Sequence, residues 1–256
     1  MTISAPAFAD HFSAVAAQYA NARPEYPAAL FDWIATVVPA RAVAWEAGCG
    51  SGQASRDLAR VFDRVHATDP SAAQVAQAKA PGNVTFAVEA AERCSLPDAS
   101  VDAVCVAQAL HWFGLPRFFD ECDRVLKPGG VLIAWGYQDM AAPAGVEQAL
   151  DPLRADILAY WPPERRLIDE AYAGFDWPFE RMETPRLDLR VDWSLSRMLG
   201  YMASYSATKR YIDATGRDPV AAYAPALAGA WGDPATVRTL HWPMFVHARR
   251  KRSQET

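Results

Sequence analysis

The sequence has few cysteines, and none of them forms a close pair. Cys49, Cys94, Cys105 and Cys122 are scattered along 256 residues, and no C-x-x-C spacing occurs. This pattern argues against a disulfide framework and a cysteine zinc site. We therefore expect four free thiols in a reducing cytoplasm, and no bound metal.

Long apolar runs and an excess of positive charge are also missing. No uninterrupted apolar stretch approaches the roughly 20 residues that cross a bilayer, and the N-terminus lacks the basic segment and apolar core of a signal peptide. The net charge is -5, whereas general nucleic-acid binders usually present a basic face. The dense basic run at 249–252 fits a solvated end of the last strand. These absences predict a cytoplasmic protein without membrane or nucleic-acid partners.

One stretch, residues 43–53, organises the chain. A short apolar run ends in Glu46, and glycines follow at alternate positions as Gly48, Gly50 and Gly52. Apolar residues at helical spacing come next, so the pattern predicts a strand, a tight turn and a helix, the first unit of a doubly wound α/β sheet. Glycine lets the chain reverse and lets a ligand approach the backbone, and the helix N-terminus offers that ligand unpaired N–H groups.

The spacing of these glycines separates two classes of cofactor. A dinucleotide-binding turn has the pattern G-x-G-x-x-G, but the third position is Gln53 when counted from Gly48 and Ser55 when counted from Gly50. The observed G-x-G-x-G after an acid resembles motif I of the class I S-adenosylmethionine (SAM) methyltransferases. That resemblance implies that the turn holds SAM. Cys49 is then a small side chain beside the ligand, with a nucleophilic role as the alternative.

Two further segments extend the resemblance over most of the first 136 residues. The phrase from His111 to Trp135 is close to the family's H-W-F-x-x-x-x-F-x-x-E-x-x-R-V-L-K-P-G-G-x-L-x-x-W. The pattern F-x-x-x-A-x-x-Y-x-x-x-R-P-x-Y-P, at 12–27, resembles the start of type-11 and trans-aconitate methyltransferase-like enzymes.

The resemblance implies a SAM-dependent methyltransferase that acts on a small-molecule acceptor, such as a carboxylate or another oxygen nucleophile, by in-line displacement. A non-catalytic SAM-binding or regulatory protein is the alternative. A nicotinamide-dependent oxidoreductase is disfavoured by Gln53 and by the later segments.

The strands that follow the turn order the candidate cofactor residues. Asp69 ends the second predicted strand about 20 residues after the turn, where doubly wound folds place an acid for the ribose hydroxyls, and a helix N-cap is a compatible alternative. Segment 89–98 resembles the family's adenine loop, with Ala90 in place of the usual aspartate. The predicted cofactor-binding residues are Tyr19, Arg23, Glu46, Gly48, Cys49, Gly50, Gly52, Gln53, Asp69, Pro70, Ala91, Glu92, Gln108 and Ala109.

His111, Tyr19 and Arg23 are the candidate catalytic residues. His111 follows the fourth predicted strand and suits a general base at neutral pH, or else it is a structural histidine beside Trp112. Arg23 offers a bidentate cation to the carboxylate of SAM or of the substrate, and a surface arginine at a helix joint is the alternative. We expect the three to converge near the SAM methyl group under a lid at 136–178.

Tyr205 and Arg210 are further candidates for the acceptor pocket, with a helix-surface position as the alternative for each.

The whole chain is interpreted as one α/β domain with a doubly wound, seven-stranded Rossmann-like sheet. Residues 1–38 form an N-terminal helical cap, 39–136 form the SAM-binding core, and 137–256 hold a helical lid followed by the last strands. The final strand, at 242–249, is expected to be antiparallel. We expect a monomer or a weak homodimer.

Overall fold

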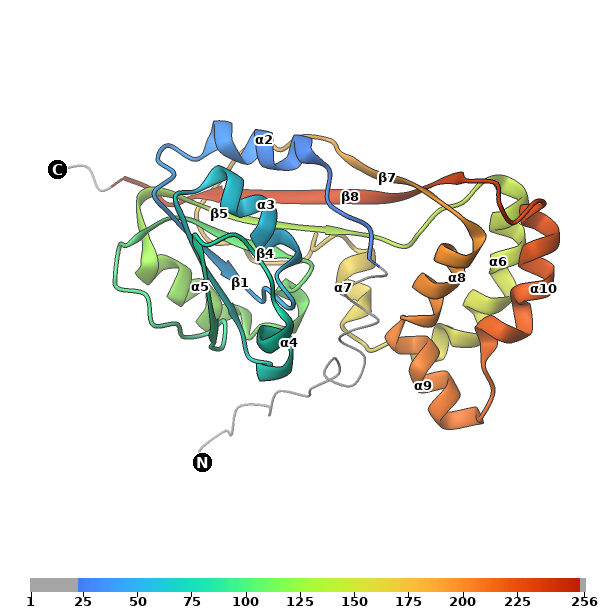
Figure 1. Ribbon diagram of the computed structural model, residues 1–256. Coiled ribbons are helices and arrows are strands. Elements are labelled where there is room, and N and C mark those ends of the chain that lie inside the picture. Colours follow the sequence, from blue (N-terminus) through green and yellow to red (C-terminus); the bar gives the residue numbers. More distant parts are fainter. Residues whose placement is uncertain (1–22, 254–256) are drawn as a thin grey trace, which may run out of the picture.

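The computed structural model describes residues 23–253, which form a sheet flanked by helices and a separate group of helices at one end (Figure 1). The first predicted helix of the N-terminal cap, with Tyr19, lies outside the described residues. The second is α2, Ala28–Val37, which follows Pro27 as expected.

The parallel half of the fold alternates strands and helices. Its elements are β1 (Val43–Ala47), α3 (Gln53–Val61), β2 (Arg64–Asp69), α4 (Ala72–Gln77), β3 (Val84–Val88), β4 (Val101–Ala107), the 3₁₀ helix η1 (Leu110–Trp112), α5 (Leu115–Val125) and β5 (Leu126–Tyr137). The remaining elements are α6 (Ala144–Ile157), η2 (Leu158–Tyr160), α7 (Arg165–Asp169), β6 (Glu180–Arg181), β7 (Asp188–Trp193), α8 (Leu195–Ala203), α9 (Ser206–Thr215), α10 (Pro219–Trp231) and β8 (Arg238–Arg250).

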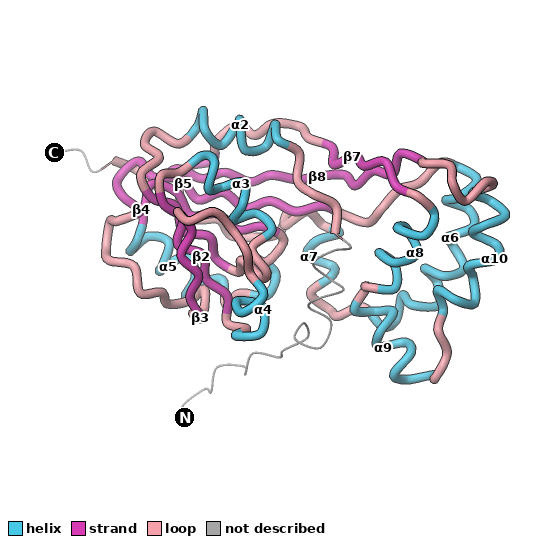
Figure 2. The backbone as a smooth tube through the Cα atoms, viewed as in Figure 1, coloured by secondary structure: helices cyan, strands magenta, loops and turns pink. Residues whose placement is uncertain are grey.

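The sheet has the order β3-β2-β1-β4-β5-β8-β6, and β7 also pairs with β8 (Figure 2). The first five strands are parallel, whereas β8 runs antiparallel to β5. Strands β6 and β7 share the seventh position, because β6 pairs with residues 249–250 of β8 and β7 pairs with 238–243. The predicted doubly wound α/β class and the antiparallel final strand are confirmed.

Two boundaries differ from the sequence prediction. The alternating pattern at 183–193 predicts one strand, but β7 begins at Asp188, and a separate two-residue strand, β6, lies before the predicted range. Strand β5 begins at Leu126, before the Pro-Gly-Gly stretch, because the chain passes directly from α5 into the ladder with β4 and is irregular between Val101 and Ala103.

The central strands are buried on both faces. In β5, Ile133 and Trp135 belong to one apolar cluster and Leu132 and Ala134 to another, and each is 0% exposed. This follows from the period-2 alternation of a strand that is covered on both sides, as in other parallel α/β sheets.

The long strands β5 and β8 continue beyond the core and carry a helical lobe, which we define as α6, η2, α8, α9 and α10 (Figure 1). Within it, α6 packs against α10. Trp193, Tyr201 and Trp242 join the lobe to the end of β7 and β8 through edge-to-face ring contacts, with centroids 5.2–5.4 Å apart. Between residues 23 and 253, the structure contains no helix with the length and apolarity needed to cross a membrane.

Candidate active site

A cavity of about 700 Å³ lies at the carboxyl ends of the parallel strands. One half is lined by the glycine turn after β1, by the ends of β2 and β3, and by the segment after β4. The other half is lined by the region around α7 and by the α8–α9 junction of the helical lobe. Ligands of open α/β sheets bind at this edge, so the cavity is the candidate active site.

The three glycines of the turn have left-handed backbones. Their φ angles are +71° at Gly48, +54° at Gly50 and +84° at Gly52. A side chain at Gly48 would collide with Ala109, and one at Gly52 would collide with Phe86. A Cβ at Gly50 would meet nothing within 4 Å, although Gly50 lines the cavity. Gly48 and Gly52 therefore permit close packing, whereas Gly50 leaves the cavity itself open beside the backbone.

Asp69 joins the ends of β1 and β2. Its carboxylate accepts hydrogen bonds from the backbone N–H of Gly50 at 2.9 Å and from that of Ser71 at 2.8 Å. The N-cap of α4 is Ser71, whose side chain accepts from the Gln74 N–H, so Asp69 does not hold the capping position suggested as its alternative role. A carboxylate has about four lone-pair sites, and these two bonds fix its orientation.

Glu46 is buried at the end of β1, with 1% of its surface exposed. It accepts a hydrogen bond from the Ser55 hydroxyl of α3. Burial raises the pKa of Glu46 to about 8, helped by the charge of Asp69 and opposed by the Ser55 hydrogen bond. Glu46 is therefore mainly protonated at neutral pH, until a cation enters the cavity that it lines.

Two glutamines of the predicted cofactor set use their side chains to hold the protein together. The Gln108 amide donates to the carbonyl of Tyr137 at 3.0 Å and accepts from its N–H at 2.8 Å, which ties the end of β4 to the end of β5. Gln53 donates to the carbonyl of Pro24 at 2.7 Å. Gln53 thereby anchors the segment that carries Arg23 to the N-terminus of α3, beside the glycine turn.

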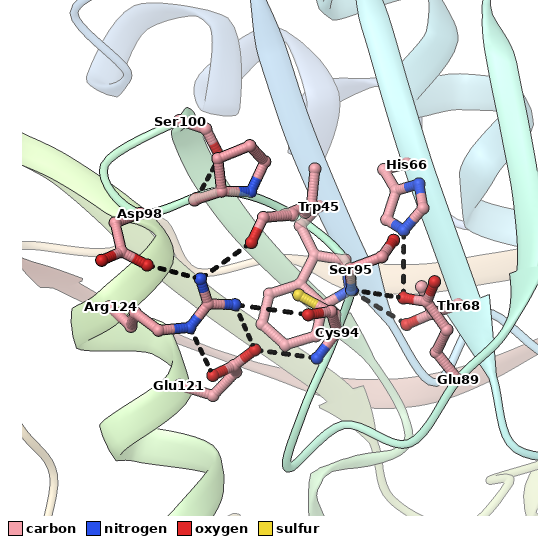
Figure 3. Close-up of polar contacts among 12 residues, drawn as sticks. Trp45, His66, Thr68, Glu89, Cys94, Ser95, Asp98, Ser100, Glu121 and Arg124 are labelled. Atoms are coloured by element: carbon pink, nitrogen blue, oxygen red, sulfur yellow. Dashed lines mark hydrogen bonds and ion pairs between the residues drawn. The ribbon is translucent and has the colours of Figure 1, made fainter.

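The adenine-loop segment is fixed to α5 by a buried ion pair (Figure 3). Glu121 is 4% exposed and accepts from Arg124 at 2.6 Å and from the Cys94 N–H at 2.8 Å. Arg124 also donates to the carbonyl of Leu96 at 2.8 Å and to Asp98 at 2.7 Å. Burial opposes ionisation of Glu121, but the Arg124 and Cys94 hydrogen bonds outweigh it and lower the pKa of Glu121 to about 2.

Two more contacts hold this loop where it meets the cavity. Glu89 accepts from the Ser95 N–H at 3.1 Å and lies 3.2 Å from His66 Nε2, as Figure 3 also shows. Glu92 accepts from the Gly114 N–H at 2.7 Å while lining the cavity. The segment that resembles the adenine loop is therefore anchored by β2, by the N-cap of α5 and by α5 itself.

His111 lies on η1, in the segment after β4, where the two halves of the cavity meet. Its Nδ1 is 2.9 Å from the hydroxyl of Tyr172. Burial and the positive charges of Arg23 and Arg165 lower the pKa of His111 to about 3, so the ring is neutral at physiological pH. Arg23 and His111 meet in one cavity, as expected, whereas Tyr19 lies outside the described residues.

The sequence analysis did not identify Arg165, although it lies beside His111. Arg165 begins α7, its Nε donates to Asp169 at 2.9 Å, and its guanidinium stacks 4.5 Å above the Trp161 ring. Tyr201 and Tyr205 close the same side from the helical lobe. The aromatic and arginine residues at 160–166 were the sequence signal that could have identified this side of the cavity.

The structure brings together nearly all of the described residues in the predicted site. Of the two acceptor-pocket candidates, Tyr205 lines the cavity and Arg210 does not. Gly52 belongs to the glycine turn but does not line the cavity. All four cysteines are unpaired and buried. Burial raises the pKa of the Cys49 thiol, which fits the passive role expected for it. The predicted residues that line the cavity are Arg23, Glu46, Gly48, Cys49, Gly50, Gln53, Asp69, Pro70, Ala91, Glu92, Gln108, Ala109 and His111.

The sheet order and the glycine-turn cavity define a Rossmann-like fold of the class I methyltransferase type. A family model described as "Methyltransferase domain" matches residues 45–134. A Dictyostelium discoideum protein named as a methyltransferase is 34% identical over 223 residues, covering 82% of each chain. A solved structure described as a type II methyltransferase from Anaeromyxobacter dehalogenans is 43% identical, with a TM-score of 0.85, and the match covers 91% of this chain and 99% of that one.

The similarity also reaches a Saccharomyces cerevisiae protein named as an S-adenosylmethionine-dependent methyltransferase, which is 32% identical over 130 residues, 47% of this chain and 45% of its own length. The chain belongs to the methyltransferase family, and it is an enzyme whose cofactor is SAM. The predicted family is therefore confirmed, and the oxidoreductase alternative is not supported.

Glu46 gives a pH dependence with a definite sign. Because its pKa is about 8 in the folded state and near 4.3 when unfolded, the native state binds more protons between these values. The free energy of unfolding should fall as pH rises from 5 to 8, by at most about 1.4 kcal/mol per pH unit from this group. Glu46→Gln keeps an acceptor for Ser55 and should flatten the profile in chemical denaturation. Glu25→Gln, at a side chain that is 76% exposed, should leave it unchanged. Identical wild-type and Glu46→Gln slopes would contradict the assignment.

Arg124→Ala should be strongly destabilising, because it leaves the buried Glu121 carboxylate without its cationic partner. We expect a loss of roughly 3–5 kcal/mol in urea denaturation, as for other broken buried pairs. The double variant Glu121→Gln, Arg124→Ala removes the uncompensated charge and should recover part of this loss. Arg166→Ala, at a side chain that is 77% exposed, should cost no more than about 1 kcal/mol. Equal effects at Arg124 and Arg166 would show that the buried pair does not hold the loop.

Proposed function

We propose that this enzyme methylates an oxygen of a small organic anion, such as a carboxylate, with SAM bound at the glycine turn. The observation that carries this proposal is the continuity of the cavity, which joins the glycine turn to a half lined by Arg23, Arg165 and His111. The expected cytoplasmic location and the monomeric or weakly dimeric state stay predictions.

The donor half suits SAM in shape and in hydrogen bonding. The open space beside Gly50 admits a ligand against the backbone, and two N–H groups orient the Asp69 carboxylate, a group that can accept from ribose hydroxyls. Glu46 lies below the turn as a carboxyl whose proton a cationic ligand would displace. Arg23 is tethered beside the turn through Pro24 and Gln53, which supports a role toward the carboxylate of SAM.

The acceptor half suits an anion. Within the described residues, the terminal nitrogens of Arg165 make no hydrogen bond, since the bond to Asp169 uses Nε. Arg165 is held flat by Trp161, so its outer edge is preorganised for a carboxylate. The low pKa of His111 makes it a weak base, which favours an oxygen that is already ionised over an alcohol or an amine.

The reaction asks little of the protein beyond alignment and the exclusion of water. When bound, SAM supplies a sulfonium methyl group: the acceptor oxygen bonds to the methyl carbon as the carbon–sulfur bond breaks, and that electron pair stays on sulfur. The residues of the chain hold the reacting oxygen in line, and positioning of this kind contributes several kcal/mol. Trp161, Tyr201 and Tyr205 close the acceptor half from the lobe side.

Gly50→Val tests the donor site. The new side chain would enter the cavity, so SAM affinity measured by calorimetry should fall by at least about tenfold. The matched control is Gly216→Val, because Gly216 likewise has a positive φ, of +71°, and open space around its missing Cβ but does not line the cavity. Both variants share the cost of a left-handed valine, and only Gly50→Val should lose SAM. Asp69→Ala should also lose at least tenfold, since each charged hydrogen bond contributes about 1.5–3 kcal/mol. Unchanged SAM binding in folded Gly50→Val would refute the donor site.

The acceptor side is tested by a screen of carboxylic acids for methyl transfer, followed by Arg165→Met. This variant keeps an unbranched apolar side chain and removes the cation, so the acceptor KM should rise about tenfold or more while SAM affinity is kept. Arg166→Met, the exposed neighbour, should change neither quantity. Arg23→Ala should instead weaken SAM binding without any acceptor present. Loss of SAM affinity in Arg165→Met, with an unchanged acceptor KM, would reverse the two assignments.

A further inference from the structure

The segment from Glu170 to Phe179, which we call the strap, connects α7 to β6 and crosses beneath η1. It places Tyr172 directly against His111, with the phenol oxygen 2.9 Å from Nδ1. Tyr172 is 1% exposed. Nothing in the sequence motifs singles out Tyr172, because its position depends on how the strap returns to the core.

The strap fixes the Tyr172 ring rigidly. Ala171 and Tyr172 have φ angles of +50° and +57°, a left-handed pair without glycine. The Tyr172 ring stacks on Phe175 at 4.9 Å with planes 13° apart, and it meets Phe245 edge-on at 4.9 Å. Non-glycine residues keep such backbones only where the surroundings determine them, and they gather at functional sites.

The direction of the Tyr172–His111 hydrogen bond follows from counting acceptors. Tyr172 is 1% exposed, and its hydroxyl lies 2.9 Å from His111 Nδ1. Burial raises the pKa of Tyr172, so the hydroxyl keeps its proton. Within the described residues, His111 Nδ1 is the acceptor that the structure provides for this proton. If Nδ1 instead carried a proton, the buried O–H would lose that acceptor.

We propose that Tyr172 is a positioning residue that holds His111 in the tautomer with a proton on Nε2, so that His111 presents a hydrogen-bond donor and no basic nitrogen to the reacting oxygen. Nδ1 is occupied by the phenol, and the other ring nitrogen carries the hydrogen. The guanidinium groups of Arg23 and Arg165 act on the same ring and oppose its protonation.

This inference rests on the proposed function and sharpens its substrate class. A donor at Nε2 stabilises an oxygen that is already negative, whereas a neutral alcohol or phenol would need a base to remove its proton. The acceptor group is therefore one that ionises well below neutral pH, and no proton has to be transferred to the protein during methylation.

The tautomer is measured directly by two-bond ¹H–¹⁵N correlation NMR on the ¹⁵N-labelled enzyme at pH 7, without SAM and with S-adenosylhomocysteine. His111→Gln identifies the His111 signals. His247 is an internal reference, because its Nε2 lies 2.8 Å from the Ala171 carbonyl and has to donate. The expected result is a protonated Nε2 and an unprotonated Nδ1 at His111. A protonated Nδ1 would overturn the proposal and restore His111 as a candidate base.

Tyr172→Phe removes the hydroxyl and should release His111 into a mixture of tautomers. Phe175→Leu is the matched control, since it disturbs the packing of the strap but keeps the hydroxyl, and it should preserve the wild-type tautomer. Persistence of a pure Nε2–H form in Tyr172→Phe would overturn the role of Tyr172. If Tyr172→Phe does not fold, the wild-type spectrum decides alone. Calorimetric SAM binding, followed in parallel, reports separately on the donor site, and the carboxylic-acid screen reports on the substrate class.

Discussion

The hydrogen bond from the Gly50 N–H to the Asp69 carboxylate joins the two strand ends on which the donor site depends. The backbone of the turn is bound to β2 a second time, because the Thr68 carbonyl accepts from the N–H groups of Gly48 and Cys49 at 2.8 and 2.9 Å. Only a chain with left-handed residues can make these contacts, which is why glycine recurs there. The same contacts aim Asp69 into the cavity and leave room beside Gly50, so the shape of the turn and its binding capacity have one cause.

The acceptor half is built on a different principle. It takes its residues from a region that leaves the sheet at the end of β5, forms α6 in the helical lobe and returns through α7 and the strap (Figure 1). Arg165 and Tyr172 therefore reach His111 from beyond the core, while His111 itself follows β4. The acceptor half forms only when the core and the segment that returns through α7 and the strap are both in place. The glycine turn needs the core alone.

The core and donor site could be predicted from sequence because their signals are local. Apolar runs marked β1, β2, β3 and β4 within a residue or two, and the glycine pattern located the turn. The acceptor half could not be predicted in this way. Tyr172 acts through a backbone conformation that nothing in its local sequence demands, and Arg165 is one of several arginines in its segment. Gln108 is predicted to bind the cofactor, and its side chain also joins β4 to β5, which only the register of those strands reveals.

Strand β8 is also a mechanical element. Its residues 244–250 belong to the ladder with β5, and its residues 238–243 belong to the ladder with β7, from which α8 continues into the helical lobe. Pro243 lies at the junction and has no N–H to contribute, although its carbonyl accepts from Gln138 at 2.9 Å. A movement of the helical lobe that widened the cavity would therefore have to bend a continuous strand that is paired on both sides of this junction. Opening of the enzyme would then require elastic bending of β8 and not rotation about a flexible loop.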